Sequence, residues 1–171
     1  VETEQALSYV VASPDGGRIV CADPGGTVQI IDVPSGRTLH TLPLGCLTAA
    51  AWSPDGARIL LCTGEQASIC ESASGALTLQ LPHPFTDAAW SADGRAIAGV
   101  TSRGSFVRCD ATGGSTTIEI GGDTGRGRVL AHGKEGSILL CSAYDGIAHL
   151  IATEGMQPIC QIQVDRADIL A

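Results

Sequence analysis

The sequence predicts an all-β fold made of four repeated units, and three observations support this prediction. A turn tetrapeptide of the type Ser-Pro-Asp-Gly recurs at 13–16, 53–56 and 91–94 and, in a degenerate form, at 133–136. Short runs of β-branched residues flank these turns, and most of the 22 glycines and 8 prolines fall between the runs. The acidic residues of successive turns lie 40, 38 and 42 positions apart. No helical period competes with this pattern.

The turn at 53–56 shows why these residue types close a hairpin. Pro54 fixes φ near the value that the second turn position needs, Asp55 can hydrogen-bond to nearby backbone, and Gly56 accepts a positive φ. The spacing of the turns is at or just below the roughly 40–45-residue period of propeller blades. We therefore expect a β-propeller segment of about four blades, each with four antiparallel strands.

Each unit is expected to contain four strands. Unit 9–42 has its strands at 9–12, 19–22, 27–32 and 38–42, and unit 46–81 has them at 47–52, 58–63, 67–71 and 76–81. Unit 85–120 has them at 86–90, 96–101, 105–110 and 116–120, and the less regular unit 128–164 has them at 128–131, 137–142, 146–151 and 158–164. The glycine-rich stretch 121–127 is predicted to be a mobile loop, and residues 165–171 to open a fifth unit.

Composition and charge exclude some classes of partner. The chain is 44% hydrophobic and 16% charged, which is ordinary for a soluble protein, and it carries a formal net charge of −8. Since nucleic acids and anionic membranes bind clustered Lys and Arg, we expect neither as a partner. The one local basic concentration is Arg103, Arg108, Arg126 and Arg128. An anion-binding patch is one interpretation, and solvated strand edges and loops are the favoured one.

The cysteines argue for a reducing compartment. Seven is an odd number, no Cys-x-x-Cys pair occurs, and the chain has no Asn to carry a glycan. Cys21, Cys62 and Cys141 follow their turn acids at similar offsets, and Cys70 and Cys109 share a late-strand position. We therefore expect buried, reduced cysteines that pack as small hydrophobes. No run approaches the roughly 18 apolar residues of a membrane span. We also expect no signal peptide, and we expect the chain to be part of a longer polypeptide.

Residues with chemical potential are present but do not form a recognisable catalytic, cofactor-binding or metal site. The four histidines, in separate strands or loops, are His40, His83, His132 and His149. Gly133-Lys134 lacks the first glycine of a Walker motif, and Gly125-Arg126-Gly127 lacks the third glycine of a dinucleotide site. Trp52 and Trp90 could anchor a partner, although packing between blades is favoured. The turn acids that could resemble a calcium array are Asp15, Asp55 and Asp93, which we expect to act as turn formers.

The units resemble the WD-repeat β-propeller family. The resemblance rests on the Ser-Pro-Asp-Gly hairpins and on the third-strand endings Ile31-Asp32, Cys70-Glu71 and Cys109-Asp110, whose acids are followed four residues later by glycine. The family's Trp before the acid is absent, and its Gly-His dipeptide appears only as Gly45-Cys46, so its His–Ser–Asp–Trp network is not expected here. Residues 52–56, 90–94 and 147–149 are also similar to segments of a WD-repeat nucleoporin.

These observations together predict a non-enzymatic scaffold. A propeller exposes loop-lined faces that other proteins can bind, so we expect protein partners within a large intracellular assembly, cytoplasmic or at the nuclear envelope, with no cofactor. The nucleoporin resemblance implies a nuclear pore component. A recognition module for a short peptide, modified or not, at the channel mouth is the alternative. The remaining blades would come from the same longer chain or from a second copy, because an unpaired blade exposes apolar flanks.

Overall fold

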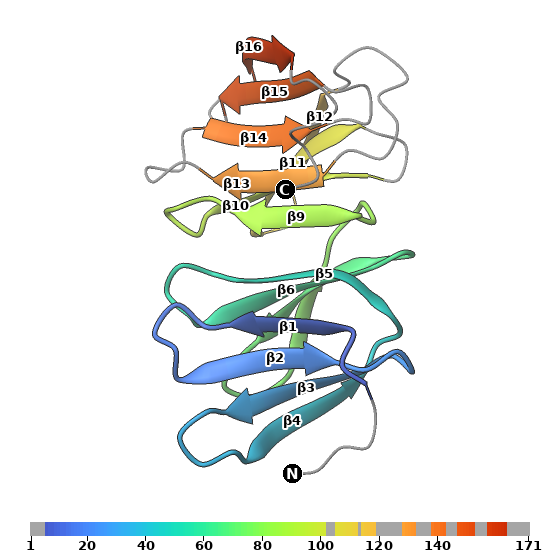
Figure 1. The fold of residues 1–171 in the computed structure, drawn as a ribbon, viewed down its shortest axis with the longest axis vertical. Coiled ribbons are helices and arrows are strands. Elements are labelled where there is room, and N and C mark those ends of the chain that lie inside the picture. Colours follow the sequence, from blue (N-terminus) through green and yellow to red (C-terminus); the bar gives the residue numbers. More distant parts are fainter. Residues whose placement is uncertain are drawn as a thin grey trace. The chain divides into compact units, whose positions relative to one another are not determined.

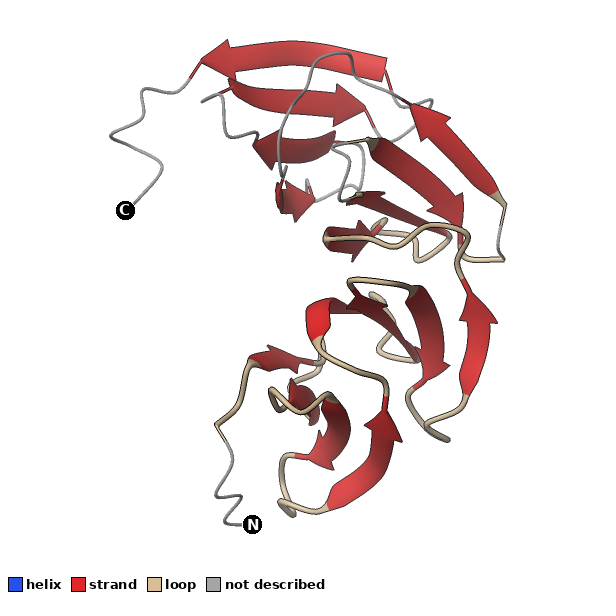
Figure 2. Ribbon diagram, turned by 90° about the vertical axis from the view of Figure 1, so that its right-hand side faces the viewer, coloured by secondary structure: helices blue, strands red, loops and turns tan. Residues whose placement is uncertain are grey.

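The computed structural model describes residues 6–101, 105–112, 114–118, 128–132, 138–142, 147–152 and 157–163. These residues form strands and turns, and no helix occurs among them (Figures 1 and 2). The strands make four antiparallel sheets of four, and each sheet uses strands that follow one another in the sequence. The predicted all-β architecture is therefore confirmed. The predicted loop 121–127 and the expected fifth unit at 165–171 lie outside the described residues.

The first two sheets follow the first two repeats. The first sheet consists of β1 (Tyr9–Ala12), β2 (Arg18–Ala22), β3 (Thr27–Asp32) and β4 (Thr38–Pro43). The second sheet consists of β5 (Leu47–Trp52), β6 (Arg58–Thr63), β7 (Ala67–Glu71) and β8 (Leu77–Gln80). Within each, neighbouring strands pair in sequence order, so every connection is a hairpin.

The third and fourth sheets have the same topology. The third consists of β9 (Asp87–Trp90), β10 (Ala96–Val100), β11 (Phe106–Asp110) and β12 (Ser115–Ile118). The fourth consists of β13 (Arg128–His132), β14 (Ile138–Ser142), β15 (Ile147–Ala152) and β16 (Gln157–Gln163). One-residue irregularities interrupt the pairing of β13 with β14 and of β15 with β16, and similar ones occur in the first and second sheets, between β3 and β4, β5 and β6, and β7 and β8.

The chain divides into two compact units, residues 1–85 with the first and second sheets and residues 86–171 with the third and fourth. In the first unit, the two sheets enclose one apolar core. Its buried residues are Val20, Ala22, Val28, Ile30, Ala50, Trp52, Ile59, Leu61 and Cys70, with Tyr9, Val11, Leu42, Leu44 and Leu47 packed around them. Small and β-branched side chains dominate this core, as the low aromatic content predicts.

In the second unit, the third sheet contains one fully buried strand, β10, beside the largely buried β11. All five residues of β10 are buried, and Phe106, Val107 and Cys109 of β11 are at most 3% exposed. The first strand of the fourth sheet, β13, packs on β9 and β10. The packing of β13 on β9 and β10 therefore covers part of the third sheet within this unit.

A close approach of two glycines links the turn between β2 and β3 to the loop that leaves β4. The backbone N–H groups of Leu44 and Gly45 donate to the Gly26 carbonyl at 3.1 and 3.0 Å. A Cβ on Gly26 would lie 2.5 Å from the Gly45 Cα, and Gly26 has a φ of 88°. Only glycine therefore fits at position 26 without moving the main chain.

Candidate functional site

The hairpin tips of the first three sheets share one hydrogen-bonded arrangement. In each, a serine hydroxyl donates to an aspartate Oδ1 two residues later at 2.6 Å; the pairs are Ser13–Asp15, Ser53–Asp55 and Ser91–Asp93. The same Oδ1 accepts a backbone N–H two residues further on at 3.0 Å. The serine Oγ accepts a backbone N–H five residues on at 2.9 Å. One serine and one aspartate side chain thus bind two backbone N–H groups of each turn, and the glycine N–H of the turn bonds to the serine carbonyl.

These contacts decide what the turn acids can do. The serine hydroxyl is the main cause that holds the pKa of Asp15, Asp55 and Asp93 below its usual value of 3.8, and the backbone N–H adds to it. Their carboxylates are therefore ionised at neutral pH and engaged by their own turns. Among the described residues, no group of three or more His, Cys, Asp or Glu side chains is placed to hold a metal ion.

Trp52 joins the first sheet to the second. Its indole Nε1 donates to the carbonyl of Val11 at 3.2 Å, and its side chain is 8% exposed. The Arg18 guanidinium lies 5.3 Å from the centroid of the Trp52 ring, a cation–π geometry. Trp52 therefore packs between sheets, as its position before the turn predicts, and Trp90 at the matching position of the third sheet is 5% exposed.

The role of Arg18 was not predicted from the sequence. Its Nη1 donates to the Ser72 hydroxyl at 2.9 Å, and its Nη2 donates to the Gly56 carbonyl at 3.2 Å. The buried Ser72 hydroxyl also donates to the Gly56 carbonyl at 2.9 Å. Arg18 thus closes a clamp across the two sheets, made of Arg18, Trp52, Gly56 and Ser72. A signal was present in the sequence, because an arginine recurs two or three residues after each turn acid, at Arg18, Arg58 and Arg95.

The structure does not bring the described histidines into one site. His40 lies on β4, and its Nε2 is 2.9 Å from the carbonyl of Ala73 in the turn between β7 and β8. His83 lies between β8 and β9 and is half-buried. His132 and His149 belong to β13 and β15, whose side chains at these positions lie outside the described residues. The described contact of His40 is thus a link between sheets.

Most of the predicted basic concentration and both glycine motifs lie outside the described residues. Arg108 forms an ion pair with Asp110 at 3.0 Å between Nη1 and Oδ1, so its charge is partly neutralised. Arg103, Arg126 and the side chain of Arg128 lie outside the described residues. The same is true of Gly125-Arg126-Gly127 and Gly133-Lys134.

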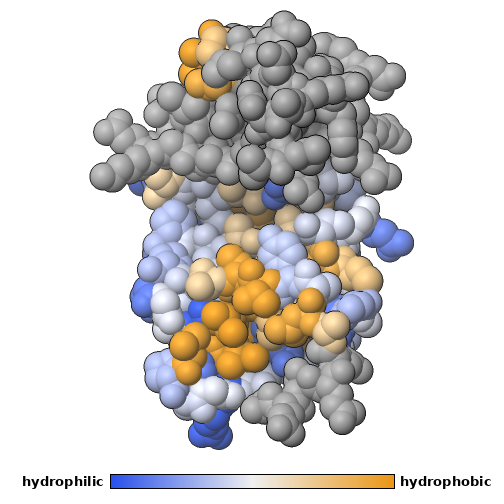
Figure 3. Space-filling model, viewed as in Figure 1, coloured by the Kyte–Doolittle hydropathy of each residue, from blue (hydrophilic) through white to orange (hydrophobic). Residues whose placement is uncertain are grey.

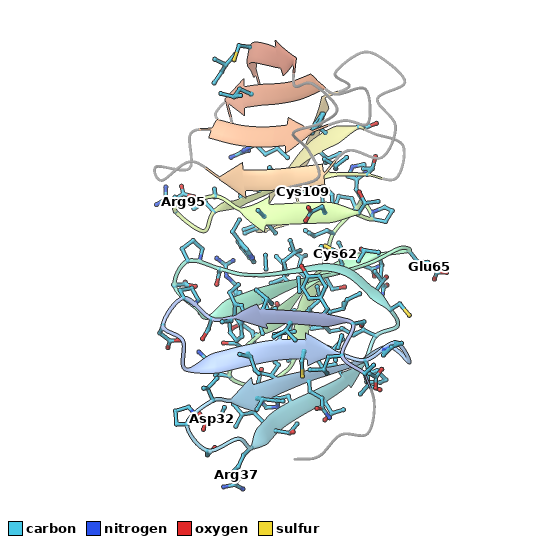
Figure 4. The ribbon with its side chains drawn as sticks, in the orientation of Figure 1. Asp32, Arg37, Cys62, Glu65, Arg95 and Cys109 are labelled. Carbon is cyan, nitrogen blue, oxygen red and sulfur yellow. The ribbon has the colours of Figure 1, made fainter. Side chains whose placement is uncertain are left out.

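The cysteines divide into buried and exposed positions. Cys21, Cys62, Cys70 and Cys109 are at most 3% exposed, and Cys62 and Cys109 lie among the strands in Figure 4. Burial, with a smaller contribution from the neighbouring acids, raises the pKa of Cys70 and of Cys109 to about 11. Cys46 and Cys160 are exposed, so the expectation of buried cysteines is wrong for these two. Cys46 lies in a loop and Cys160 in an outermost strand, where no neighbouring sheet covers the described side chain.

Charged side chains are exposed at hairpin connections at both ends of the strands. Arg37, in the turn between β3 and β4, and Glu65, between β6 and β7, are exposed and point away from their sheets (Figure 4). They lie at opposite ends of the strands (Figure 4): Arg37 is in a connection between a third and a fourth strand and Glu65 in one between a second and a third strand, and successive hairpin connections of an antiparallel sheet fall at opposite strand ends. Within the described part of the chain, no helix is both long and apolar enough to span a bilayer.

Comparison with known proteins identifies the architecture. No family model matches the chain, and no curated protein matches it in sequence. Among solved structures, it is similar to the β-propeller domain of Cps50 (Swd1) from Myceliophteria thermophila, with a TM-score of 0.81 and 15% identity. The predicted β-propeller fold is thereby confirmed, while membership of the WD-repeat family stays a prediction from sequence motifs.

The comparison is limited to shape. The match covers 96% of this chain and 56% of that domain, so the chain spans a little more than half the length of the propeller it resembles. In all, 1444 chains of solved structure match, and a fold so widely used does not choose between functions. The function must therefore be argued from the surfaces of this chain.

Proposed function

We propose that this chain is a non-enzymatic propeller segment that serves as a docking platform for other proteins in a large intracellular assembly. The observation that supports the proposal is that Asp15, Asp55 and Asp93 are hydrogen-bonded within their own turns. The described turns bind their own acids through serine and backbone donors, which leaves loop ends and side-chain charges such as Arg37 and Glu65 for a partner. Rigid strands that present exposed loops are a common basis for protein recognition.

The proposal includes a mode of completing the propeller. Further blades, from the same longer chain or from a second copy, would cover sheets that otherwise end in apolar faces. The partners would be other protein subunits, and the negative net charge disfavours nucleic acid.

A more specific proposal concerns the assembly. Residues 52–56, 90–94 and 147–149 resemble segments of the nucleoporin aladin, and this sequence resemblance supports a place in the nuclear pore. A fluorescently tagged protein would then label the nuclear rim and co-purify with nucleoporins. A diffuse cytoplasmic signal with no nucleoporin in the purified complex would contradict this proposal and leave the docking function open.

The docking function is tested by affinity purification with charge-reversal variants at each end of the strands. Arg37→Glu alters the end that carries the β3–β4 turn, and Glu65→Lys alters the opposite end. Both side chains are exposed, so stability should change by less than about 0.5 kcal/mol. We expect stoichiometric protein partners with the unchanged chain and their loss with one of the two variants.

Two outcomes would redirect the proposal. Retention of every partner by both variants, together with displacement of a partner by a short peptide, would favour the peptide-recognition alternative. A catalytic turnover that survives purification of the chain alone would contradict a purely docking role.

A further inference from the structure

Each hairpin tip of the first three sheets contains an aspartate followed directly by a glycine. The dipeptides are Asp15-Gly16, Asp55-Gly56 and Asp93-Gly94. This sequence is prone to isoaspartate formation, because the glycine has no side chain to obstruct the approach of its backbone nitrogen to the aspartate carboxyl. A fourth pair, Asp145-Gly146, lies outside the described residues. The three described tips therefore contain groups that can react with one another inside the chain.

The reaction needs only water as co-reactant. The glycine nitrogen forms a bond to Cγ of the neutral aspartic acid and gives up its proton, and the carboxyl hydroxyl leaves as water, which yields a cyclic succinimide. Water then breaks the bond between that nitrogen and the former main-chain carbonyl carbon. This carbon becomes a carboxylate, and the chain continues through Cβ and Cγ. One water is lost and one is added, no atom is oxidised or reduced, and the main chain becomes longer by one methylene.

The native turns hold both reacting groups in hydrogen bonds. The N–H of each of these glycines donates to the carbonyl of the serine three residues earlier at 2.9 Å. The aspartate Oδ1 accepts the serine hydroxyl at 2.6 Å and a backbone N–H at 3.0 Å. The serine hydroxyl, as the largest cause, also lowers the pKa of each aspartate, which reduces the amount of neutral acid. The reaction is therefore expected to proceed from turns that have opened.

Access of water does not distinguish the three turns. Asp15, Asp55 and Asp93 are all exposed. In the first unit, Figure 3 shows hydrophilic side chains at the ends of the strands and hydrophobic ones over the strands between them. A difference in reaction rate must then come from how readily each turn opens.

The third hairpin tip lacks the proline of the other two. Ala92 occupies the position of Pro14 and Pro54. Proline restricts φ and so reduces the number of open conformations that a turn can adopt. Since alanine imposes no such restriction, the turn at 91–94 should open more often than the turns at 13–16 and 53–56.

The serine of the third tip is also less protected from water. Ser91 is half-buried, whereas Ser13 is 4% exposed and Ser53 is 0% exposed. Water can therefore compete more easily for the hydroxyl of Ser91, which weakens the net contribution of its hydrogen bond to Asp93.

The second hairpin tip is held most firmly. The carbonyl of Gly56 accepts hydrogen bonds from Nη2 of Arg18 at 3.2 Å and from the buried Ser72 hydroxyl at 2.9 Å. These donors come from outside the turn, so opening of the turn must also break them. Asp55 should therefore react most slowly of the three.

We propose that Asp93 is the aspartate of the three described hairpin tips at which isoaspartate forms first, and that serine and proline protect Asp15 and Asp55 from the same reaction. The product would disturb the connection between β9 and β10, because a longer main chain no longer fits the turn that pairs Trp90 with Ile97. This inference goes beyond the proposed docking function and does not depend on it.

The test is prolonged incubation of the folded chain at neutral pH in water enriched in heavy oxygen. After digestion in ordinary water, chromatography and mass spectrometry quantify isoaspartate at each site, and incorporated heavy oxygen shows that it formed through the succinimide. We expect isoaspartate earliest at Asp93 and latest at Asp55. Equal rates at the three sites, or a faster reaction at Asp15 or Asp55 than at Asp93, would overturn the proposal.

Exchange of the residue before the aspartate tests the role of proline. Ala92→Pro should slow the reaction at Asp93 by about two- to fivefold, and the reverse change Pro54→Ala should accelerate it at Asp55 by a similar factor. Pro14 and Pro54 lie in turns with the same hydrogen bonds, so position 92 should accept proline. The rate at Asp15 is the internal reference and should not change. An unchanged rate at Asp93 in the first variant, or at Asp55 in the second, would contradict the role of proline.

Substitution of Ser91 tests the role of the hydroxyl. Ser91→Ala removes the hydrogen bond to Asp93 and should accelerate the reaction there by about two- to tenfold. Ser91→Thr keeps a hydroxyl and should react at close to the original rate. Equal acceleration by both substitutions would contradict protection by the hydroxyl.

The same incubation in guanidinium chloride separates the effect of the fold from that of the sequence. All three aspartates precede glycine, so their rates should become nearly equal once the turns are unfolded. If the faster reaction of Asp93 persists undiminished in the denaturant, protection by the folded turns is wrong.

Discussion

At the scale of single residues, the serine of each hairpin tip does more for the fold than its size suggests. Ser53 is fully buried, and its hydroxyl both donates to Asp55 and accepts the backbone N–H of Arg58. Loss of this buried hydroxyl leaves the partly buried backbone N–H of Arg58 without this acceptor, and a lost partner of this kind typically costs about 1–3 kcal/mol.

We therefore expect Ser53→Ala to lower the free energy of unfolding by about 1–3 kcal/mol in urea denaturation. Ser74→Ala serves as the control, because Ser74 is exposed and accepts only a 3.2 Å hydrogen bond from the backbone of Ala76. That control should change stability by less than about 0.5 kcal/mol. Equal effects of the two substitutions would contradict the role given to the buried hydroxyl.

The turn acids also predict a dependence of stability on pH. The pKa of Asp15, Asp55 and Asp93 is lowered in the folded chain, first by the serine hydroxyl and then by a backbone N–H. A lowered folded-state pKa stabilises the fold above the unfolded-state pKa, and this contribution is lost as the pH falls through the folded-state value. The unfolding temperature should therefore change little with pH near neutrality, where these carboxylates stay ionised. It should decrease when the pH is lowered below about 5.

Asp55→Asn provides the comparison for the pH experiment. Its amide cannot be ionised, so the variant should be less stable at pH 7 and show a shallower decline in unfolding temperature on acidification. A decline as steep as that of the unchanged chain would show that other carboxylates dominate acid unfolding.

At the scale of elements, the clamp of Arg18, Trp52, Gly56 and Ser72 connects two sheets through groups distant in the sequence. Arg18 is 54 positions from Ser72 and 38 from Gly56, while Trp52 is 41 positions from Val11. The Arg18 guanidinium lies over the Trp52 ring. The effect of substituting one of these residues on the free energy of unfolding should therefore depend on whether the other is present.

A double-mutant cycle of Arg18→Met and Trp52→Phe measures that dependence. Residues in direct contact typically show a coupling energy of about 0.5–3 kcal/mol, and we expect a value in this range from denaturant unfolding. Arg37→Met combined with Trp52→Phe is the control, because Arg37 is exposed and directed away from its sheet. Additive effects in both cycles would mean that the cation–π contact contributes nothing measurable.

The elements could be predicted from the sequence where their causes are local. The turn around Asp55 is determined by four adjacent residues, so its type and place were available without coordinates, and the strand ends follow from it. The hydrogen-bond partners of Arg18 could not be predicted, because nothing in the sequence near position 18 indicates Ser72 or Gly56. Trp52 lies between these cases: its position before the turn predicted packing between sheets, but its hydrogen-bond acceptor could not be predicted.

The candidate site shows the same division. That the turn acids serve their own turns followed from residue type and spacing, and the contacts of Asp15 agree with that. Exposure depends on which neighbours surround a strand or loop, which local sequence does not encode. This is why Cys46 and Cys160 were expected to be buried and are exposed.

At the scale of the whole molecule, the distribution of cysteines predicts a reactivity pattern. Cys46 and Cys160 are exposed, whereas burial raises the pKa of Cys70 and Cys109 to about 11 and so suppresses their thiolates. With a thiol reagent under native conditions, we expect Cys46 and Cys160 to react rapidly, and Cys70 and Cys109 only on unfolding. Peptide mass spectrometry after timed labelling identifies each site.

Cys46→Ser is the control for this experiment. It should remove one rapid site without changing the labelling of Cys70 or Cys109. Rapid labelling of either buried thiol in the folded chain would contradict the burial of β7 or β11 that the structure gives.

The hydrogen bonds between the first and second sheets have a consequence for how such a sequence can diverge. Trp52, Arg18 and His40 each place a polar group against a main-chain carbonyl of the other sheet, at Val11, Gly56 and Ala73. A carbonyl is present whatever residue occupies the position, so mutation at the accepting side leaves the bond available. The sequences of the repeats can therefore diverge until their similarity is no longer recognisable, while the arrangement of the sheets is kept. A chain that is only 15% identical to a solved propeller can for this reason still superpose on it.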